Sequence, residues 1–262
     1  MILDVILKHK QKEVAVSKKR LVLSVLKKEV LSLPQAKPRF LEALEESRGI
    51  AVIAEIKRKS PSKGILRKNF DPCAIARDYE RGGASALSVL TDEKFFGGSS
   101  QILKKVRTVT RLPILRKDFI IDEYQIWESK RMGADAVLLI AGVLSAAKLL
   151  KFSALAHRLG LDTLVEVHTE GEARKALRVK APLVGINNRD LKDFRVDLAT
   201  TKRLAGLFSK KICLVSESGI QSRKDLVYLE ACGAKAVLVG ESLMRRPSPG
   251  AALKALLGIS RG

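Results

Sequence analysis

The sequence lacks the long apolar runs that membrane spans and secretion signals need. No stretch approaches the roughly 18 consecutive apolar residues of a transmembrane helix. Near the N-terminus, Lys8, Lys10 and Lys12 interrupt any apolar region of the kind that precedes a signal-peptide cleavage site. We therefore expect a cytoplasmic protein with no membrane partner.

Cysteine and histidine are also scarce, which argues against disulfide frameworks and metal sites. The three cysteines lie far apart and form no Cys-x-x-Cys pair: Cys73, Cys213 and Cys232. The three histidines are equally scattered: His9, His157 and His168. We expect no bound metal, but His168 directly follows a strand candidate, a position from which a side chain can line a site.

Aromatic and acidic residues are the other two shortages. Aromatics make up 5% of the chain, and 28 acidic residues face 49 basic ones, which gives a formal charge of +21. Such an excess raises nucleic-acid binding as an alternative function. The charge is spread along the chain, however, and aromatics do not interleave with it as a base-stacking platform requires. We expect no nucleic-acid partner and favour a small anionic substrate.

Aliphatic, β-branched runs are what the sequence has in abundance. They recur along the chain with room for one helix between neighbours. The runs are Ala51–Lys57, Ala86–Thr91, Ile114–Phe119, Ala136–Ala141, Thr163–Val167, Leu183–Asn187, Ile212–Ser218 and Ala236–Gly240. This count of eight predicts a (β/α)8 TIM barrel of the α/β class. A doubly wound sheet is the alternative, but no Gly-x-Gly-x-x-Gly follows the first run.

Helical segments separate these runs, and several end at glycine, the usual residue just after a helix. The clearest are Pro72–Arg81, Asp122–Met132, Ser145–Leu159 and Arg223–Ala231. Similar turn sequences then lead into the next strand at 82–86, 133–136 and 233–236. This repetition favours the barrel, which we assign to residues 46–262.

Residues 1–45 differ from the repeating part of the chain. Spaced apolar residues predict one or two amphipathic helices, which Pro34 and Pro38 interrupt. We interpret this segment as an N-terminal helical extension packed on the barrel, and its lysines as a solvated face.

Polar residues end most of the strand candidates. Barrel enzymes place their active sites at the C-terminal ends of the strands, so these side chains should converge. They include Glu55, Lys57, Lys117, Glu166, Asn187 and Glu217, whereas 137–140 offer only apolar atoms. Any one of them fits a structural ion pair or a loop residue, but their matching positions favour one site.

The loops after the last two strands indicate phosphate binding. Ser218-Gly219 follows the seventh run, and Gly240-Glu241 follows the eighth. Barrels often bind phosphate there through backbone N–H groups and a short helix, which we expect at 242–245. The Glu241 side chain should turn away, since a carboxylate repels phosphate.

Several of these motifs together closely resemble the indole-3-glycerol phosphate synthase family. The resemblance runs in order from about residue 40 to 250. The motifs are Ile53–Ser62, Ile114–Phe119, Leu164–Val167, Gly185–Leu191, Val215–Ile220 and Val239–Arg245. It implies conversion of 1-(2-carboxyphenylamino)-1-deoxyribulose 5-phosphate to indole-3-glycerol phosphate, with loss of carbon dioxide and water, in tryptophan biosynthesis. No cofactor or metal is implied, and other enzymes of that pathway are candidate partners.

The resemblance also implies roles for the strand-end residues. Lys117 is expected to protonate the ketone as the ring closes, and Glu166 to serve the later loss of the hydroxyl and a proton. We expect neighbouring cations to lower the pKa of Lys117, with Lys57 as the source of that charge. Glu55 would position Lys57. Hydrogen bonds to substrate would come from Asn187 and Glu217.

The same resemblance implies a substrate-binding set. Arg189 would hold the carboxylate, Ser60 and Pro61 would belong to a loop over the site, and Phe119 would flank the aromatic ring. Backbone donors to the phosphate would come from Ser218, Gly219, Gly240 and Glu241. Another phosphate-binding barrel enzyme, such as a phosphoribosylanthranilate isomerase, is the alternative, but it gives no reason for the Glu-x-Lys-x-x-Ser-Pro motif at 55–61.

Overall fold

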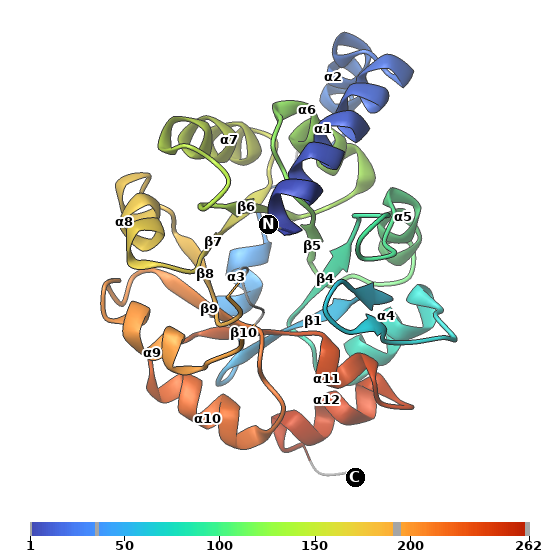
Figure 1. The fold of residues 1–262 in the computed structure, drawn as a ribbon. Coiled ribbons are helices and arrows are strands. Elements are labelled where there is room, and N and C mark those ends of the chain that lie inside the picture. Colours follow the sequence, from blue (N-terminus) through green and yellow to red (C-terminus); the bar gives the residue numbers. More distant parts are fainter. Residues whose placement is uncertain (1, 35–36, 191–194, 260–262) are drawn as a thin grey trace.

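Eight parallel strands close into a barrel in the computed structural model, which describes residues 2–34, 37–190 and 195–259 (Figure 1). In chain order they are β1 (Ala51–Ile56), β4 (Ala86–Leu90), β5 (Ile114–Lys117), β6 (Ala136–Ile140), β7 (Asp162–Val167), β8 (Leu183–Asn187), β9 (Cys213–Glu217) and β10 (Ala236–Val239). Each pairs with its sequence neighbours, and β10 closes on β1. The predicted TIM barrel is confirmed.

Helices on the outside of the barrel alternate with these strands. They are α4 (Pro72–Arg81), α5 (Ser100–Arg107), α6 (Glu123–Met132), α7 (Ala146–Arg158), α8 (Glu170–Arg178), α9 (Ala199–Ala205), α10 (Arg223–Ala231), α11 (Glu241–Met244) and α12 (Pro249–Leu257). The predicted boundaries differ by at most one residue where N-caps replace the first helical residue, as Asp122 does for α6. In the described part of the chain, no helix is both long and apolar enough to cross a membrane.

Strand alternation divides the core into an outer and an inner part. One set of side chains packs under the helices, and the other fills the barrel with small and aliphatic residues. The inner set includes Ile53, Leu115, Leu164 and Val215. These apolar layers support the strand ends, where the inward-facing positions become polar.

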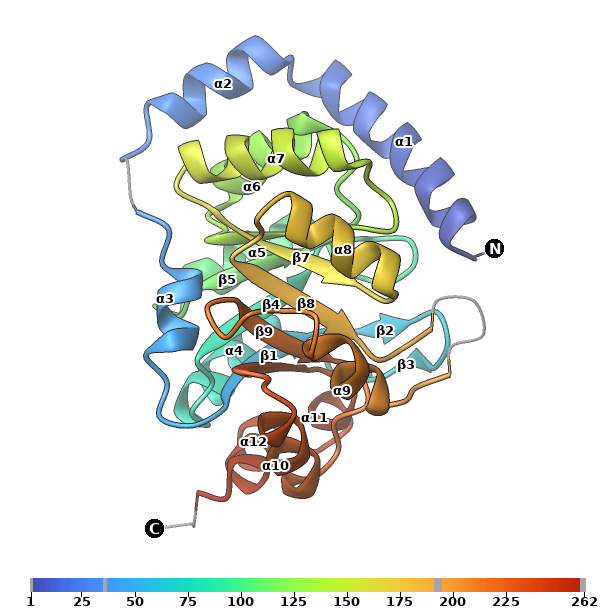
Figure 2. The same ribbon diagram turned by 90° about the vertical axis from the view of Figure 1, so that its left-hand side faces the viewer.

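The N-terminal segment forms three helices, α1 (Ile2–Arg20), α2 (Leu23–Leu31) and α3 (Phe40–Glu45), the last of which was not predicted. In Figure 2, α1 and α2 arch over α6 and α7, and α3 lies at the opposite end of the barrel from the hairpin of β2 (Lys59–Ser60) and β3 (Gly64–Ile65). Phe40 and Leu44 of α3 are buried with the inner core. The N–H groups of Phe40 and Leu41 donate to Asp162 at 2.8 and 3.0 Å, which fixes α3 as a plug. The domain boundary at residue 45 stays a prediction.

One lysine of α1 contradicts the expectation of a solvated face. Lys10 is only 4% exposed, and its Nζ lies 2.9 Å from carboxylate oxygens of both Asp92 and Asp118. Asp118 also pairs with Arg116. The prediction was wrong for Lys10 because helical periodicity shows which face is apolar but not which charged residue meets a buried partner.

Candidate active site

A cavity of about 1140 Å³ opens at the carboxyl ends of the strands. It is lined by every site residue that the sequence suggested. These are Glu55, Lys57, Ser60, Pro61, Lys117, Phe119, Glu166, Asn187, Arg189, Glu217, Ser218, Gly219, Gly240 and Glu241. Leu191, the last residue of one motif, lies outside the described residues. The structure thus brings the candidates together, while their individual roles stay predictions.

Strand register explains why these side chains meet. Lys117 is the last residue of β5, two positions after inward-facing Leu115, and Glu166 follows Leu164 in the same way on β7. Asn187 and Glu217 are paired in register at the ends of β8 and β9. Period-two alternation therefore turns all of these polar ends toward the barrel axis.

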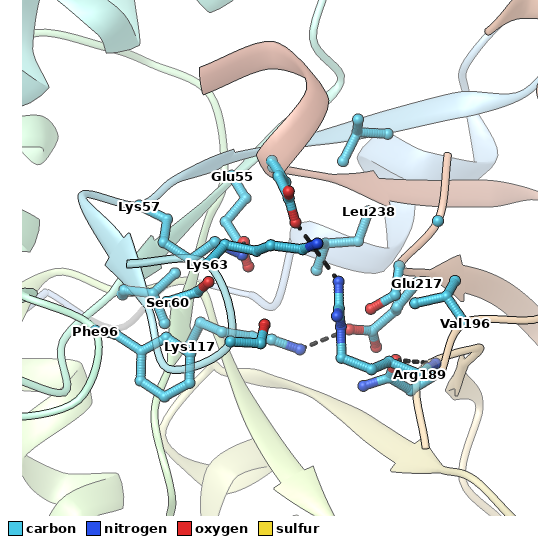
Figure 3. Close-up of a pocket in the computed structure, with 18 of the residues that line it drawn as sticks. Glu55, Lys57, Ser60, Lys63, Phe96, Lys117, Arg189, Val196, Glu217 and Leu238 are labelled. Carbon is cyan, nitrogen blue, oxygen red and sulfur yellow. Dashed lines mark hydrogen bonds and ion pairs between the residues drawn. The ribbon is translucent and has the colours of Figure 1, made fainter. Parts of the chain in front are cut away.

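Lys117 is the centre of the cavity floor. Its Nζ donates to Oε2 of Glu166 at 2.8 Å and to Oε2 of Glu217 at 2.5 Å. Figure 3 shows Lys117 reaching across the cavity toward Glu217 on the opposite wall. Two carboxylates from different strands thus hold one ammonium group in a fixed position.

The charge of Lys117 differs from the sequence-based expectation. Burial alone would lower its pKa, but Glu166, Glu217 and Glu55 outweigh burial and raise the pKa above its ordinary value. The expected lowering was wrong because the nearest charges are carboxylates, and Lys57 itself is paired with Glu55. Lys117 is consequently protonated near neutral pH, as a proton donor must be.

The two carboxylates beside Lys117 have opposite pKa shifts. Burial raises the pKa of Glu217 to about 7, and Glu166 and Glu55 add to this effect while Lys117 opposes it. Burial would also raise the pKa of Glu166, but Lys117 and His168 outweigh it and hold the pKa below its ordinary value. Because these groups share one lysine, they titrate as a coupled set.

Glu55 and Lys57 form an ion pair on the neighbouring wall, as their shared strand face predicts. Glu55 is 3% exposed, and Tyr79 donates its hydroxyl to the Glu55 carbonyl at 3.3 Å. Gly240 packs so closely against the Glu55 carboxylate that a side chain there would overlap it. The pair is therefore held from both sides at the cavity edge.

Glycine is also required beneath Glu217. A Cβ atom at Gly185 would overlap Oε1 of Glu217 and crowd Leu164. We expect Gly185→Ala to cost about 1–3 kcal/mol of unfolding free energy through overpacking. It should also lower kcat, because Glu217 must move away from Lys117.

Urea unfolding and steady-state kinetics check the Gly185 prediction. Gly206→Ala is the matched control, since that glycine has φ −61° and a methyl group added there would meet no neighbouring atom within 4 Å. Wild-type stability and kcat in Gly185→Ala would contradict the close approach of Glu217.

A short hairpin, β2 (Lys59–Ser60) paired with β3 (Gly64–Ile65), overhangs the cavity after β1. Pro61 stands in its turn. The Lys59 N–H donates to the Phe96 carbonyl, which links the hairpin to the loop after β4. Among the described residues the buried Ser60 hydroxyl has no hydrogen-bond partner.

The two candidate phosphate loops lie side by side at the mouth. Ser218 and Gly219 have φ values of +67° and +88°, and the Ser242 hydroxyl donates to the Ile220 carbonyl at 2.8 Å. The short helix α11 begins at Glu241 rather than at the expected Ser242.

The Glu241 side chain lies against two arginines at the cavity, and its orientation relative to a phosphate stays a prediction. Its carboxylate lies 3.6 Å from Nη2 of Arg189 and 3.3 Å from Nε of Arg245. These two cations neutralise a charge that would otherwise repel an anion, and both line the cavity.

Sequence reasoning missed several cavity residues. Phe96 is one of them: it pairs with Phe119 at a ring-centroid distance of 6.1 Å, next to Leu138 and Ile140 of the 137–140 run, whose place in the cavity wall was predicted. Ile6, from α1, also lines the cavity. The apolar run at 137–140 predicts a wall of this kind, but no local signal indicates that α1 reaches the mouth.

Within residues 2–34, 37–190 and 195–259, no group of three His, Cys, Asp or Glu side chains is arranged to hold a metal ion. The acidic and basic groups that line the cavity are protein side chains, mainly lysines and glutamates. Together, fold and cavity define a (β/α)8-barrel enzyme with an acid–base site at the carboxyl ends of its strands.

Comparison with known proteins identifies the family. The family model described as indole-3-glycerol phosphate synthase matches residues 3–256. An indole-3-glycerol phosphate synthase from Legionella pneumophila (strain Paris) is 46% identical over 256 residues, covering 98% of each chain. One from Clostridium acetobutylicum is 47% identical over 245 residues, covering 94% of this chain and 93% of that one. The chain belongs to the indole-3-glycerol phosphate synthase family.

It is therefore a lyase of tryptophan biosynthesis that acts on a phosphorylated small molecule and forms indole-3-glycerol phosphate with decarboxylation. The isomerase alternative is not favoured.

Solved structures of low sequence identity share the barrel. Thiamine phosphate pyrophosphorylase from Pyrococcus furiosus has a TM-score of 0.60 and 18% identity, covering 80% of this chain and 95% of that one. KGPDC from Streptococcus mutans has a TM-score of 0.60 and 12% identity, covering 80% and 97%. Likeness at this level shows the fold alone.

Proposed function

We propose that Lys117 is the general acid of ring closure. It carries a proton, and its two carboxylate partners aim its ammonium group at the cavity. Protonation of the substrate ketone makes that carbon electrophilic toward the aromatic ring. The cyclised iminium then accepts the electrons released with carbon dioxide, so no protein electron sink is needed.

Glu166 is the proposed acid–base group of the second stage. It gives a proton to the departing hydroxyl and accepts one from the ring carbon as the indole becomes aromatic. Asn187 supports Glu166 through a hydrogen bond between their side chains. Glu217, with its raised pKa, would hydrogen-bond the hydroxyl intermediate through Oε1, which lacks a partner among the described residues.

Substrate charge is matched by cations around the cavity. Lys57, held by Glu55, and Arg189, which lies against Glu241, are the proposed contacts to anionic groups. The phosphate would lie on the backbone of Ser218, Gly219, Gly240 and Glu241. The aromatic ring would lie in the apolar wall that Phe119 shares with Phe96, beneath the Ser60–Pro61 hairpin turn.

The remaining parts of the proposal concern the protein's surroundings. We place the enzyme in the cytoplasm, acting on an anionic sugar phosphate without nucleic-acid or membrane partners. Other tryptophan-pathway enzymes are candidate partners. The basic surface would raise the encounter rate with a multiply charged substrate, and this rate should fall with added salt.

A single observation carries the assignment of roles: Lys117 lies between Glu166 and Glu217 on the cavity floor. Single-turnover experiments should separate the two stages. Glu166→Gln should still release carbon dioxide but form indole about 10²-fold more slowly, because only the dehydration loses its acid. Equal loss of both products would contradict this division, and no turnover by folded wild-type protein would overturn the function itself.

A further inference from the structure

His168 stands directly behind the proposed acid–base residue. It directly follows β7, the strand that carries Glu166, and the Glu166 side chain lines the cavity. Its Nε2 atom lies 3.5 Å from Oε1 of Glu166, while Lys117 binds the other oxygen, Oε2. Nε2 is buried and has no hydrogen-bond partner among the described residues. The imidazole is therefore aimed at a carboxylate that the reaction uses.

A second carboxylate holds the opposite side of the ring. Glu172 of α8 accepts the backbone N–H of His168 at 2.8 Å and lies 3.3 Å from Nδ1 with the same oxygen, Oε2. An ionised carboxylate can only accept, so Nδ1 carries a hydrogen. Nε2 is then the position at which the imidazole gains or loses a proton, and this position faces Glu166.

The charges around the ring favour its protonated form. Burial lowers the pKa of His168, but Glu172, Glu166 and Glu217 outweigh burial and raise the pKa above its ordinary value. Lys117 lies on the far side of Glu166. The His168 side chain keeps 11% exposure, against 5% for Glu166, so the ring as a whole lies nearer solvent than the carboxylate, while Nε2 itself is buried.

The reaction needs a supply of protons. One proton goes to the ketone oxygen and one to the departing hydroxyl, while the ring carbon returns only one. Loss of a carboxylate as neutral carbon dioxide thus consumes one proton in each turnover. Glu166 alone is a poor store because its pKa is held below the ordinary value.

We propose that His168 is a positioning residue that holds the proton for Glu166 and recharges it from solvent between turnovers. This inference rests on the proposed role of Glu166. In the step, the Nε2–H bond breaks as a proton passes to Oε1 of Glu166, which gives it to the hydroxyl leaving as water. Glu166 then takes the proton from the ring carbon and passes it through Oε2 to Lys117, which gave its own proton to the ketone. The neutral imidazole, still bound to Glu172 through Nδ1–H, then takes a proton from solvent.

The test compares kcat for wild type and His168→Gln across pH. About pH 6 lies below the ordinary imidazole pKa, and therefore below the raised pKa of His168. At that pH the kcat of the variant should be about 10-fold lower or more, with little change in KM. As pH rises above the His168 pKa, wild type loses the same proton, so the two rates should converge. Glu217 titrates in both proteins, so the ratio of the two rates is compared rather than either rate alone. A ratio that is constant with pH would mean a structural role and would overturn the proposal.

His157→Gln is the matched control, since His157 lies exposed on α7 and should leave kcat unchanged. Ring proton NMR gives an independent readout, because the chain has three histidines. The His168 signal should titrate above the ordinary imidazole pKa, and Glu172→Gln should move it, and the alkaline fall of kcat, to lower pH. No movement in Glu172→Gln would also overturn the proposal.

The two proposals can fail separately. If Glu166→Gln forms indole at the wild-type rate, the role of Glu166 is wrong. If Glu166→Gln stalls after carbon dioxide release while His168→Gln follows wild type at every pH, only the role of His168 is wrong.

Discussion

Lys117→Ala should lower kcat by about 10³-fold or more, with KM changed much less. The ammonium group is the proposed acid for the first chemical step, and no other described cation is held between Glu166 and Glu217. Both ring closure and carbon dioxide release should therefore be lost. This pattern differs from that of Glu166→Gln, in which carbon dioxide release should continue.

The small effect on KM has a structural reason. Substrate anions are assigned to Lys57, Arg189 and the phosphate loops, all of which the Ala variant retains. Without Lys117, two neighbouring buried carboxylates remain, and they should take up a proton rather than stay doubly ionised. The cavity therefore keeps its shape and its binding groups while losing the acid.

Rapid-quench measurements of carbon dioxide and indole, together with steady-state kcat and KM, check this prediction. Lys105→Ala, on an exposed position of α5, is the matched control and should behave as wild type. A Lys117→Ala variant with near-normal kcat would rule out the general-acid role. A large rise in KM with unchanged kcat would instead make Lys117 a binding residue.

The barrel and the convergence of its polar strand ends could be predicted because both follow from local periodicity. Leu115 and Lys117 share a face, as do Leu164 and Glu166, so an apolar layer with a polar end was readable in each run. Strand ends were placed up to two residues too late, as at Phe119, because apolar residues continue into the loop after pairing stops.

The features that the sequence did not predict depend on contacts between segments far apart in the chain. The pKa of Lys117 is set by Glu166 and Glu217, which lie 49 and 100 residues away. The plug α3 is fixed by Asp162. Neither contact leaves a periodic signal, so the direction of a pKa shift and the position of a short helix could not be predicted.

Lys10→Met should lower the unfolding free energy by about 3 kcal/mol or more. Lys10 is buried against Asp92, which is 0% exposed, and Asp118. Methionine keeps the length of the side chain but removes its charge, so both carboxylates lose a buried cation. Arg116 still pairs with Asp118, which leaves Asp92 as the group most affected. Lys12→Met, exposed on the same helix, should be nearly neutral.

The pH dependence of this loss separates electrostatics from packing. Burial would raise the pKa of Asp118, but Arg116 and Lys10 outweigh it and lower the pKa to about 2. A depressed pKa stabilises the fold above the unfolded pKa, and that stabilisation disappears as pH falls through the folded value. The difference between wild type and Lys10→Met should therefore be largest near neutral pH and narrow from about pH 4 downward. Urea unfolding at several pH values measures it, and a difference independent of pH would show that Lys10 acts through packing alone.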